Sequence, residues 1–248
     1  MPTFVVDSRA EAEHVLAGEI ADLLRARPEA VLGLATGNSP IGVYRDLCAL
    51  HAAGEVSFAR ATTFNLDEYL GLQDGDPRTF RRWMQTHLFD HVQPRSTNLP
   101  ECHAPLASAD AVAVRYEQAL QAAGGIDLQV LGIGLNGHIG FNEPGSTRTS
   151  RTRVVELDQR TRKHAVRVFG DLAQVPTQAI TMGVASILDA RRLRVLAFGA
   201  EKAEIVRRTL FDPISAECPA TFLRGHHDVK LYLDAAAAEL IEDSALPS

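Results

Sequence analysis

A histidine and a glutamate stand five residues apart in a glycine-rich stretch, NGHIGFNEPGS, that follows a short apolar run. The run, residues 128–133, predicts a buried parallel strand, and open α/β sheets bind ligands beyond the carboxyl ends of such strands. A hydrogen bond from His138 to the Glu143 carboxylate would fix the tautomer of the ring and raise its basicity. The two residues are therefore candidates for acid–base catalysis, although ordinary loop residues would also fit this pattern.

Two adjacent carboxylates, Asp67 and Glu68, follow a second predicted strand at residues 61–65. Neighbours on an extended segment point to opposite sides, so one carboxylate can face a cleft as a base. The other would face solvent or a partner cation. A solvated acidic turn is the alternative, but the pair falls where this loop would converge with the two other candidate loops at one sheet edge.

A third loop has the composition of an anion-binding cradle. The small residues Thr36, Gly37, Asn38 and Ser39 lie between a predicted strand at residues 31–34 and a helix that starts near Ile41. Backbone N–H groups, hydroxyls and the helix N-terminus would all favour a phosphate there. The alternative is an ordinary turn with Ser39 as N-cap and Pro40 at the first helical position.

Arg167 and Lys202 are the candidate phosphate cations. Lys202 begins a predicted helix after the strand at residues 194–198, where a cation opposes the helix dipole and a functional reason is plausible. Arg167 lies among Arg160, Arg162 and Lys163, so a solvated basic face is its simplest alternative.

The same region matches a dinucleotide fingerprint at Gly132, Gly134 and Gly137. That fingerprint needs a helix to open at its third glycine, and Gly140 and Pro144 interrupt the next two turns. The sequence therefore predicts no nicotinamide or flavin cofactor.

Metal and disulfide sites are not indicated either. The cysteines Cys48, Cys102 and Cys218 are odd in number and widely spaced, so we expect reduced thiols. His138 and Glu143 lack a third zinc ligand at motif-like spacing, and the His226–His227 pair fits a polar turn.

Composition narrows the class of protein. A chain of 248 residues that is 46% hydrophobic can bury a full core, and we expect a single α/β domain over residues 1–248. The net charge of −6 and the isoelectric point near 5.8 disfavour nucleic acid as a partner. Without a signal-like N-terminus or a membrane-length apolar stretch, the sequence predicts a cytoplasmic protein.

Short apolar runs alternate with helical patterns, which predicts a largely parallel sheet with helices on both faces. Ser8 and Glu11 form a capping-box pair before the first helix. The further strands are expected at residues 3–6, 153–157, 179–181 and 229–233, and helices at 41–53, 80–89, 109–123 and 235–238.

Taken together, these motifs resemble the glucosamine-6-phosphate deaminase family along nearly the whole chain. LGLATGNSP, TFNLDEYLGL, LGIGLNGHIGFNEPGS, SRTR, QVPTQAITMGV and FGAEKA occur in the order that this family shows. The resemblance implies a Rossmann-like α/β fold and a cofactor-free, metal-free enzyme of amino-sugar catabolism. It would convert glucosamine 6-phosphate and water into fructose 6-phosphate and ammonia.

The resemblance also implies roles for the candidate residues. Asp67 would move a proton from C2 to C1 of the open-chain sugar, and His138, held by Glu143, would assist ring opening. The cradle of residues 36–39 would hold the phosphate with Arg167 and Lys202.

The chain departs from the family pattern at two places. Many members have Asp where this chain has Asn136, so we expect His138 to be less easily protonated and activity to be retained through Glu143. Allosteric members carry a basic residue and Thr where this chain has Val155 and Glu156, and they have a longer tail. Activation by N-acetylglucosamine 6-phosphate is therefore not expected, and the sequence does not decide between a monomer and a homo-oligomer.

Two other functions remain open at this stage. A 6-phosphogluconolactonase-like hydrolase would share the fold and the phosphate site, but has no evident use for Asp67 as a C2-to-C1 base. A non-catalytic sugar-phosphate sensor would need the cradle and its cations without Asp67, His138 and Glu143.

Overall fold

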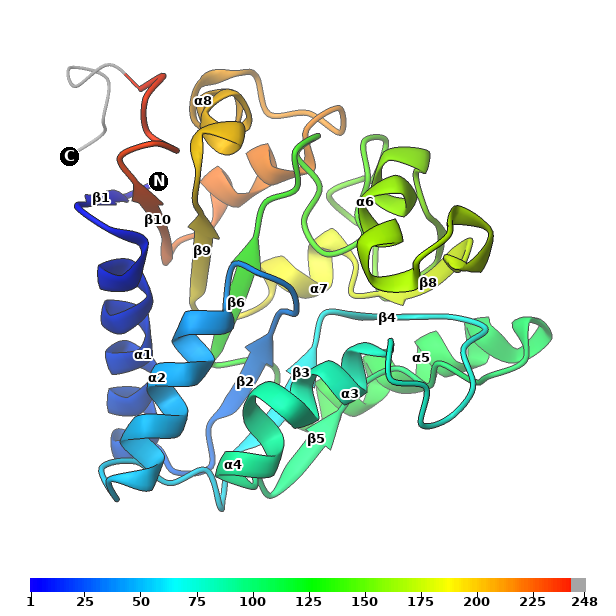
Figure 1. Cartoon of the computed structure of the whole chain (residues 1–248), viewed down its shortest axis with the longest axis horizontal. Coiled ribbons are helices and arrows are strands. Elements are labelled where there is room, and N and C mark those ends of the chain that lie inside the picture. The colour runs from blue at the N-terminus through cyan, green and yellow to red at the C-terminus, as the bar shows by residue number, and fades with distance from the viewer. Residues whose placement is uncertain (242–248) are drawn as a thin grey trace.

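A seven-stranded parallel sheet and a three-stranded antiparallel sheet organise the chain, whose computed structural model describes residues 1–241. Figure 1 shows the central strands of the large sheet pointing upward. In spatial order its strands are β1 (Thr3–Val6), β10 (Val229–Asp234), β9 (Leu193–Ala197), β6 (Leu128–Gly132), β2 (Val31–Leu34), β3 (Thr62–Asn65) and β5 (Ser96–Asn98). All of their pairings are parallel, so the predicted fold class is confirmed.

Helices cover both faces of the large sheet. The α-helices of five or more residues are α1 (Arg9–Ala26), α2 (Ile41–Ala52), α3 (Phe80–Met84), α5 (Ala109–Ala122), α6 (Gln159–Phe169), α7 (Val184–Leu188) and α8 (Ala203–Phe211). The shorter or irregular helical pieces are η1 (Gln85–Phe89), α4 (Asp90–Val92), η2 (Leu106–Ser108), η3 (Leu172–Gln174), η4 (Ala200–Lys202) and η5 (Pro219–Gly225).

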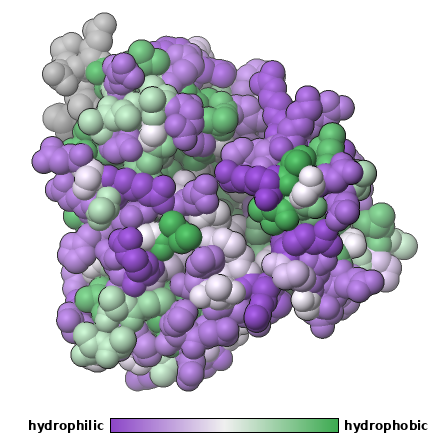
Figure 2. All heavy atoms as spheres, viewed as in Figure 1, coloured by the Kyte–Doolittle hydropathy of each residue, from purple (hydrophilic) through white to green (hydrophobic). Residues whose placement is uncertain are grey.

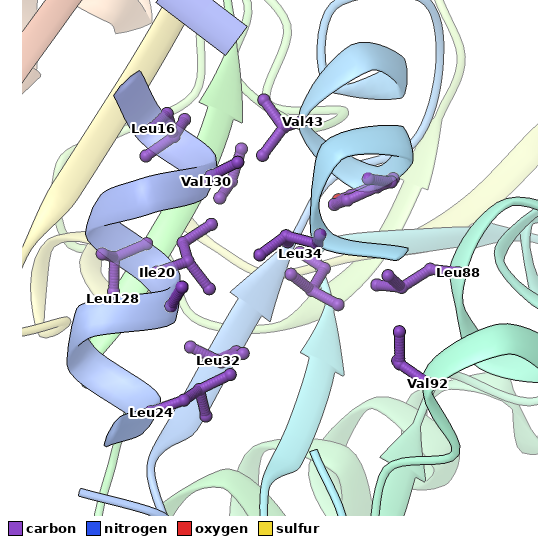
Figure 3. Packing of buried hydrophobic residues seen from close by; sticks show 14 of the residues in the cluster. Leu16, Ile20, Leu24, Leu32, Leu34, Val43, Leu88, Val92, Leu128 and Val130 are labelled. Carbon is purple, nitrogen blue, oxygen red and sulfur yellow. The ribbon is translucent and has the colours of Figure 1, made fainter. Parts of the chain in front are cut away.

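The core divides between the two faces because side chains alternate along each strand. On one face α1, α2 and the η1–α4 region pack over β2 and β6, as Figure 3 shows for Leu16, Ile20, Leu32 and Val130. On the other face α5 and α8 pack over the alternate residues of the same strands. The predicted cap of α1 is present, because Ser8 Oγ accepts from the Glu11 N–H at 3.2 Å.

The second sheet contains β4 (Asp67–Tyr69), β8 (Gln178–Thr181) and β7 (Arg153–Glu156). Leu66 joins the two sheets: its N–H donates to Leu34 O at 3.0 Å, and its carbonyl accepts from the Met182 N–H at 2.7 Å. Figure 1 shows β4 leaving the end of β3 and running beside β8 and α6. The chain thus passes from one sheet to the other within a single residue.

Some sequence expectations were wrong. The strands predicted at 153–157 and 179–181 are present as β7 and β8, but they lie outside the parallel sheet, because β8 pairs antiparallel with β7 on one side and with β4 on the other. The helix predicted at 80–89, by contrast, is present over its full range, as α3 followed directly by the π-helical turn η1. Residues 235–238 form a turn, because the Asp234 carboxylate accepts the N–H groups of Gly199 and Ala237 and fixes the chain there.

The surface drawn in Figure 2 is mostly hydrophilic, with hydrophobic side chains in small separate groups. Within residues 1–241, no helix combines the length and the apolar character that crossing a membrane requires. Residues 242–248 of the predicted domain lie outside the described part.

Gly183 offers a test of how tightly the end of β8 is packed. A Cβ there would lie 2.1 Å from Ser150 O. The same carbonyl oxygen accepts the Ala185 N–H at the start of α7. We expect Gly183→Ala to destabilise the fold by about 1–3 kcal/mol, because the clash is with backbone. Gly18→Ala is the matched control: nothing lies within 4 Å of its Cβ, so it should stabilise α1 by about 0.5–1 kcal/mol. Urea denaturation measures both, and equal stability of the two variants would contradict this packing.

Candidate active site

The three candidate loops follow neighbouring strands and meet at one edge of the large sheet. β2 pairs with both β3 and β6 in parallel, so residues 35–39, 66–68 and 133–143 all leave the same carboxyl edge. The convergence expected from the sequence is therefore present. The His226–His227 pair precedes β10 and lies at the opposite edge, where His226 Nε2 contacts Ala190 O at 2.7 Å.

The loop that carries His138 closes on itself. The Gly134 N–H donates to His138 O at 2.9 Å, and the Gly137 N–H donates to Gly134 O at 2.9 Å. The imidazole lies over Gly134, where a Cβ would be 2.2 Å from His138 Nε2. This turn requires glycine at position 134. No helix begins at Gly137, so the helix that a dinucleotide fingerprint needs is missing there.

Glu143 is the centre of a hydrogen-bond network. Its Oε2 lies 3.2 Å from His138 Nδ1 and accepts from Asn136 Nδ2 at 2.7 Å, and its Oε1 accepts from Thr161 Oγ1. Burial alone would raise the pKa of Glu143, but hydrogen bonds from His138, Thr161 and Asn136 hold it below its usual value. An ionised carboxylate only accepts, so Nδ1 carries the proton and Nε2 is left with a lone pair.

Asn142 fixes the rest of this loop. Its buried amide donates to Ile139 O and Met182 O, each at 2.8 Å, and its Oδ1 accepts from Arg153. The loop is therefore tied both to itself and to the small sheet.

Asp67 lies directly under this loop. It pairs with Thr181 across β4 and β8, and its Oδ2 would be 3.3 Å from a Cβ at Gly140. No hydrogen bond reaches its carboxylate from the described residues, 1–241. Burial, followed by the charge of Glu68, raises the pKa of Asp67 to about 8. A carboxylate with this pKa is a strong base beside the backbone of the histidine loop.

Glu68 is buried and does not face solvent, and within residues 1–241 no cation side chain forms an ion pair with it, although the nearby charge of Arg81 acts to lower its pKa. Its carboxylate accepts the N–H groups of Tyr69, Phe80 and Arg81 at 2.9, 3.0 and 2.9 Å. Burial raises the pKa of Glu68 to about 7, although these three hydrogen bonds oppose the shift. The start of α3 had not been recognised as a partner, because the contact joins residues that are far apart along the chain.

The predicted anion cradle corresponds to the turn between β2 and α2. Gly37 has φ +96°, which favours glycine, and Pro40 rather than Ser39 is the N-cap of α2. The Ser39 hydroxyl therefore makes no capping hydrogen bond to α2. Its Oγ instead lies 3.6 Å from the Cβ position of Gly132, at the end of β6.

Lys202 approaches the same place from the other side. Its ammonium donates to Ile133 O at 2.7 Å, one residue beyond Gly132. Burial lowers the pKa of Lys202, Glu201 opposes this shift, and the charge of Arg167 adds to it. Arg167 thus lies close enough to Lys202 for the two charges to interact, as a shared anion site requires.

Sequence reasoning missed two residues of α6. Thr161 donates to Glu143, and His164 lies near both cations: burial, then Arg167, Lys202 and His138, lower the pKa of His164. Only recognition of a helix at residues 159–169 could have placed them on the face that carries Arg167.

A cavity of about 570 Å³ borders Glu143. Its lining includes Ser146, Arg153, Val155 and Glu156. Among residues 1–241, no three His, Cys, Asp or Glu side chains cluster in a way that could hold a metal ion.

Comparison with known proteins gives consistent matches. The family model described as glucosamine-6-phosphate isomerases/6-phosphogluconolactonase matches residues 7–232. A glucosamine-6-phosphate deaminase of Pseudarthrobacter chlorophenolicus is 45% identical over 226 residues, covering 91% of this chain and 87% of that protein. A solved structure of a monomeric glucosamine-6-phosphate deaminase has TM-score 0.92 and 41% identity, and the match covers 97% of this chain and 100% of that one.

A 6-phosphogluconolactonase from Trypanosoma brucei is also similar in structure, with TM-score 0.78 over 97% of this chain and 98% of that one. At 21% identity it shares the fold alone. The family resemblance predicted from the motifs is confirmed by these matches.

The buried Asp67 carboxyl should make the folded chain less stable as pH rises. Its native pKa of about 8 lies above the ordinary value, so the unfolded chain releases this proton first. Between about pH 4 and pH 8, folding loses at most about 1.4 kcal/mol per pH unit. Asp67→Asn should therefore be more stable than the parent chain near neutral pH and nearly equal to it below about pH 4. Urea denaturation across this range measures the difference, and a pH-independent difference would contradict the raised pKa.

Proposed function

Because the chain belongs to the glucosamine-6-phosphate isomerase/6-phosphogluconolactonase family, we propose that it is a glucosamine-6-phosphate deaminase. It converts glucosamine 6-phosphate and water into fructose 6-phosphate and ammonia. The observation that carries the proposal is the buried Asp67 carboxylate, which lies against Gly140 within two residues of His138. The overall change is an internal oxidation–reduction of the sugar followed by hydrolysis, so the chemistry itself calls for no redox cofactor.

The phosphate is the remote handle that orients the substrate. The cradle of residues 36–39 binds it with its N–H groups and hydroxyls, and Lys202 and Arg167 neutralise its charge. This arrangement directs the sugar carbons along the sheet edge towards Asp67 and His138. Binding energy from a non-reacting group then serves orientation at the reacting carbons.

His138 assists ring opening through Nε2. The Glu143 carboxylate holds Nδ1–H, so the lone pair of Nε2 takes the proton from the C1 hydroxyl and delivers a proton to the ring oxygen. Asn136 donates to the same carboxylate oxygen as His138, which keeps Glu143 in place through a neutral amide. Thr161 of α6 also holds Glu143, by donating to its other carboxylate oxygen.

Asp67 acts on the open-chain sugar. Its ionised carboxylate removes the proton from C2, which the neighbouring aldehyde acidifies, and returns it to C1. As O1 of the aldehyde takes a proton from the substrate's ammonium group, the electron pair of the broken C2–H bond forms the enol and then the new C1–H bond, and C2 becomes an iminium carbon. Water adds to C2, ammonia leaves, and the ketone of fructose 6-phosphate remains.

Two rival functions are weaker. A lactonase opens an ester with water and needs no base between C1 and C2, and the lactonase neighbours share only the fold at about 21% identity. A phosphate-binding sensor would not need a buried, unpaired carboxylate, which raises the cost of folding above its ordinary pKa.

The deaminase reaction predicts ammonia and fructose 6-phosphate in equal amounts from glucosamine 6-phosphate. Asp67→Asn should lower kcat by at least about a hundredfold, because it removes the proton carrier. Coupled assays for both products measure this. Lactone hydrolysis without ammonia would select the lactonase, and tight binding without turnover, unaltered by Asp67→Asn, would select the sensor.

The pH dependence tests the environment of Asp67. The base must be ionised, so kcat/KM should rise with pH through the raised pKa of Asp67 in the free enzyme. Glu68→Gln removes the neighbouring charge that contributes to this shift, and the acid limb should move to lower pH. Glu55→Gln, at an exposed carboxylate after α2, is the control and should leave the limb in place. An unchanged limb in Glu68→Gln would refute the coupling.

A further inference from the structure

We propose that Arg9 is a positioning residue of the phosphate site, which acts by holding the carbonyl of Asn38. The inference rests on the proposed function only in taking residues 36–39 as the phosphate cradle. Arg9 is the first residue of α1 and lies far from every motif that marks the site in the sequence.

The contacts of Arg9 are specific. Its Nη2 donates to Asn38 O, and its Nε donates to Glu13 Oε1 at 2.7 Å. Its guanidinium carbon lies 5.3 Å from the centre of the Phe198 ring. Phe198 directly precedes the Gly199–Lys202 segment, so one guanidinium contacts both loops that flank the proposed anion.

The contact with Asn38 determines the direction of an N–H group. In a trans peptide the carbonyl and the following N–H point to opposite sides. Because Asn38 O points at Arg9, the Ser39 N–H points away from Arg9. That orientation offers the N–H to an anion in the cradle, and it keeps a carbonyl oxygen from facing the phosphate.

Glu13 keeps the guanidinium in this position. Its carboxylate is buried against α2, where a Cβ at Gly42 would lie 1.9 Å from Oε2. A carboxylate fixed in this way holds Nε of Arg9 and leaves Nη2 for the cradle. Arg45 also approaches Glu13, at 3.9 Å, but its hydrogen bond and its other ion pair go to Asp46 and not to residues 36–39.

The place of Arg9 in its helix supports a role beyond α1. A cation in the first helical turn opposes the helix dipole, so local helix stability does not favour arginine there. The compensation comes from Glu13, Asn38 and Phe198, and two of these belong to the site loops.

The experiment compares Arg9→Met with Arg45→Met. Methionine retains apolar contact with Phe198 but cannot donate to Asn38 O. Isothermal titration with inorganic phosphate and with fructose 6-phosphate measures binding without turnover. We expect Arg9→Met to weaken both by about five- to tenfold and to raise KM for glucosamine 6-phosphate similarly, with kcat within about twofold. Arg45→Met should match the parent chain, and Arg9→Lys should recover part of the affinity.

Several outcomes would overturn the inference. These are parent-like phosphate affinity in Arg9→Met, equal losses in Arg9→Met and Arg45→Met, or no phosphate binding by the parent chain. A parent chain that binds phosphate and releases no ammonia would refute the proposed function alone, because the role of Arg9 is read from the titrations. Thermal denaturation of each variant verifies that the fold is intact.

Discussion

The backbone hydrogen bonds of Leu66 to both sheets are the constraint on which the site depends. Its N–H continues the β2–β3 ladder, and its carbonyl begins the contact with β8. The next residue, Asp67, is thereby delivered to the edge of the large sheet while its backbone already pairs with Thr181. Without this change of sheet, the carboxylate would follow the direction of β3 and would not lie under Gly140.

Asp67 and Glu68 show how neighbouring residues of similar chemistry receive different environments. Glu68 accepts three backbone N–H groups, one from Tyr69 and two at the start of α3, whereas no donor within residues 1–241 bonds to the Asp67 carboxylate. The Glu68 carboxylate serves as a structural anion at a helix terminus. The buried environment of Asp67 disfavours the ionised form of its carboxyl group, which is unfavourable for folding and favourable for a base.

Much of this arrangement could be predicted from local sequence. The apolar runs located most strands of the parallel sheet, and the motif positions correctly indicated that the loops after β2, β3 and β6 converge. The small sheet could not be assigned, because alternation identifies a strand but not its partner. The helix α6 was missed although its sequence is amphipathic: only Ala165 and Phe169 of its residues are buried, and the basic residues between 160 and 163 fitted an ordinary solvated segment equally well.

The residues that support the site were harder to find for the same reason. These residues act through contacts between segments that are distant in the chain, which the spacing of residues in a motif does not predict. They are Thr161, Asn142 and Arg9. Glu68 was identified as part of the acidic pair, yet its partner was mistaken because the α3 N-terminus comes twelve residues later. Chemistry-bearing residues thus stand out by type and spacing, whereas their supports emerge only from tertiary structure.

The helix α6 carries Arg167 near one end and Thr161 near the other, so one rigid element contacts both the proposed phosphate and Glu143. Its attachment is light, since only two of its residues are buried. A sugar without a phosphate would leave Arg167 without its anion and give α6 less reason to stay in place over Glu143. Phosphorylated sugars would then be turned over faster as well as bound more tightly. The reason is that α6, which contacts the phosphate, also holds Glu143 and through it His138.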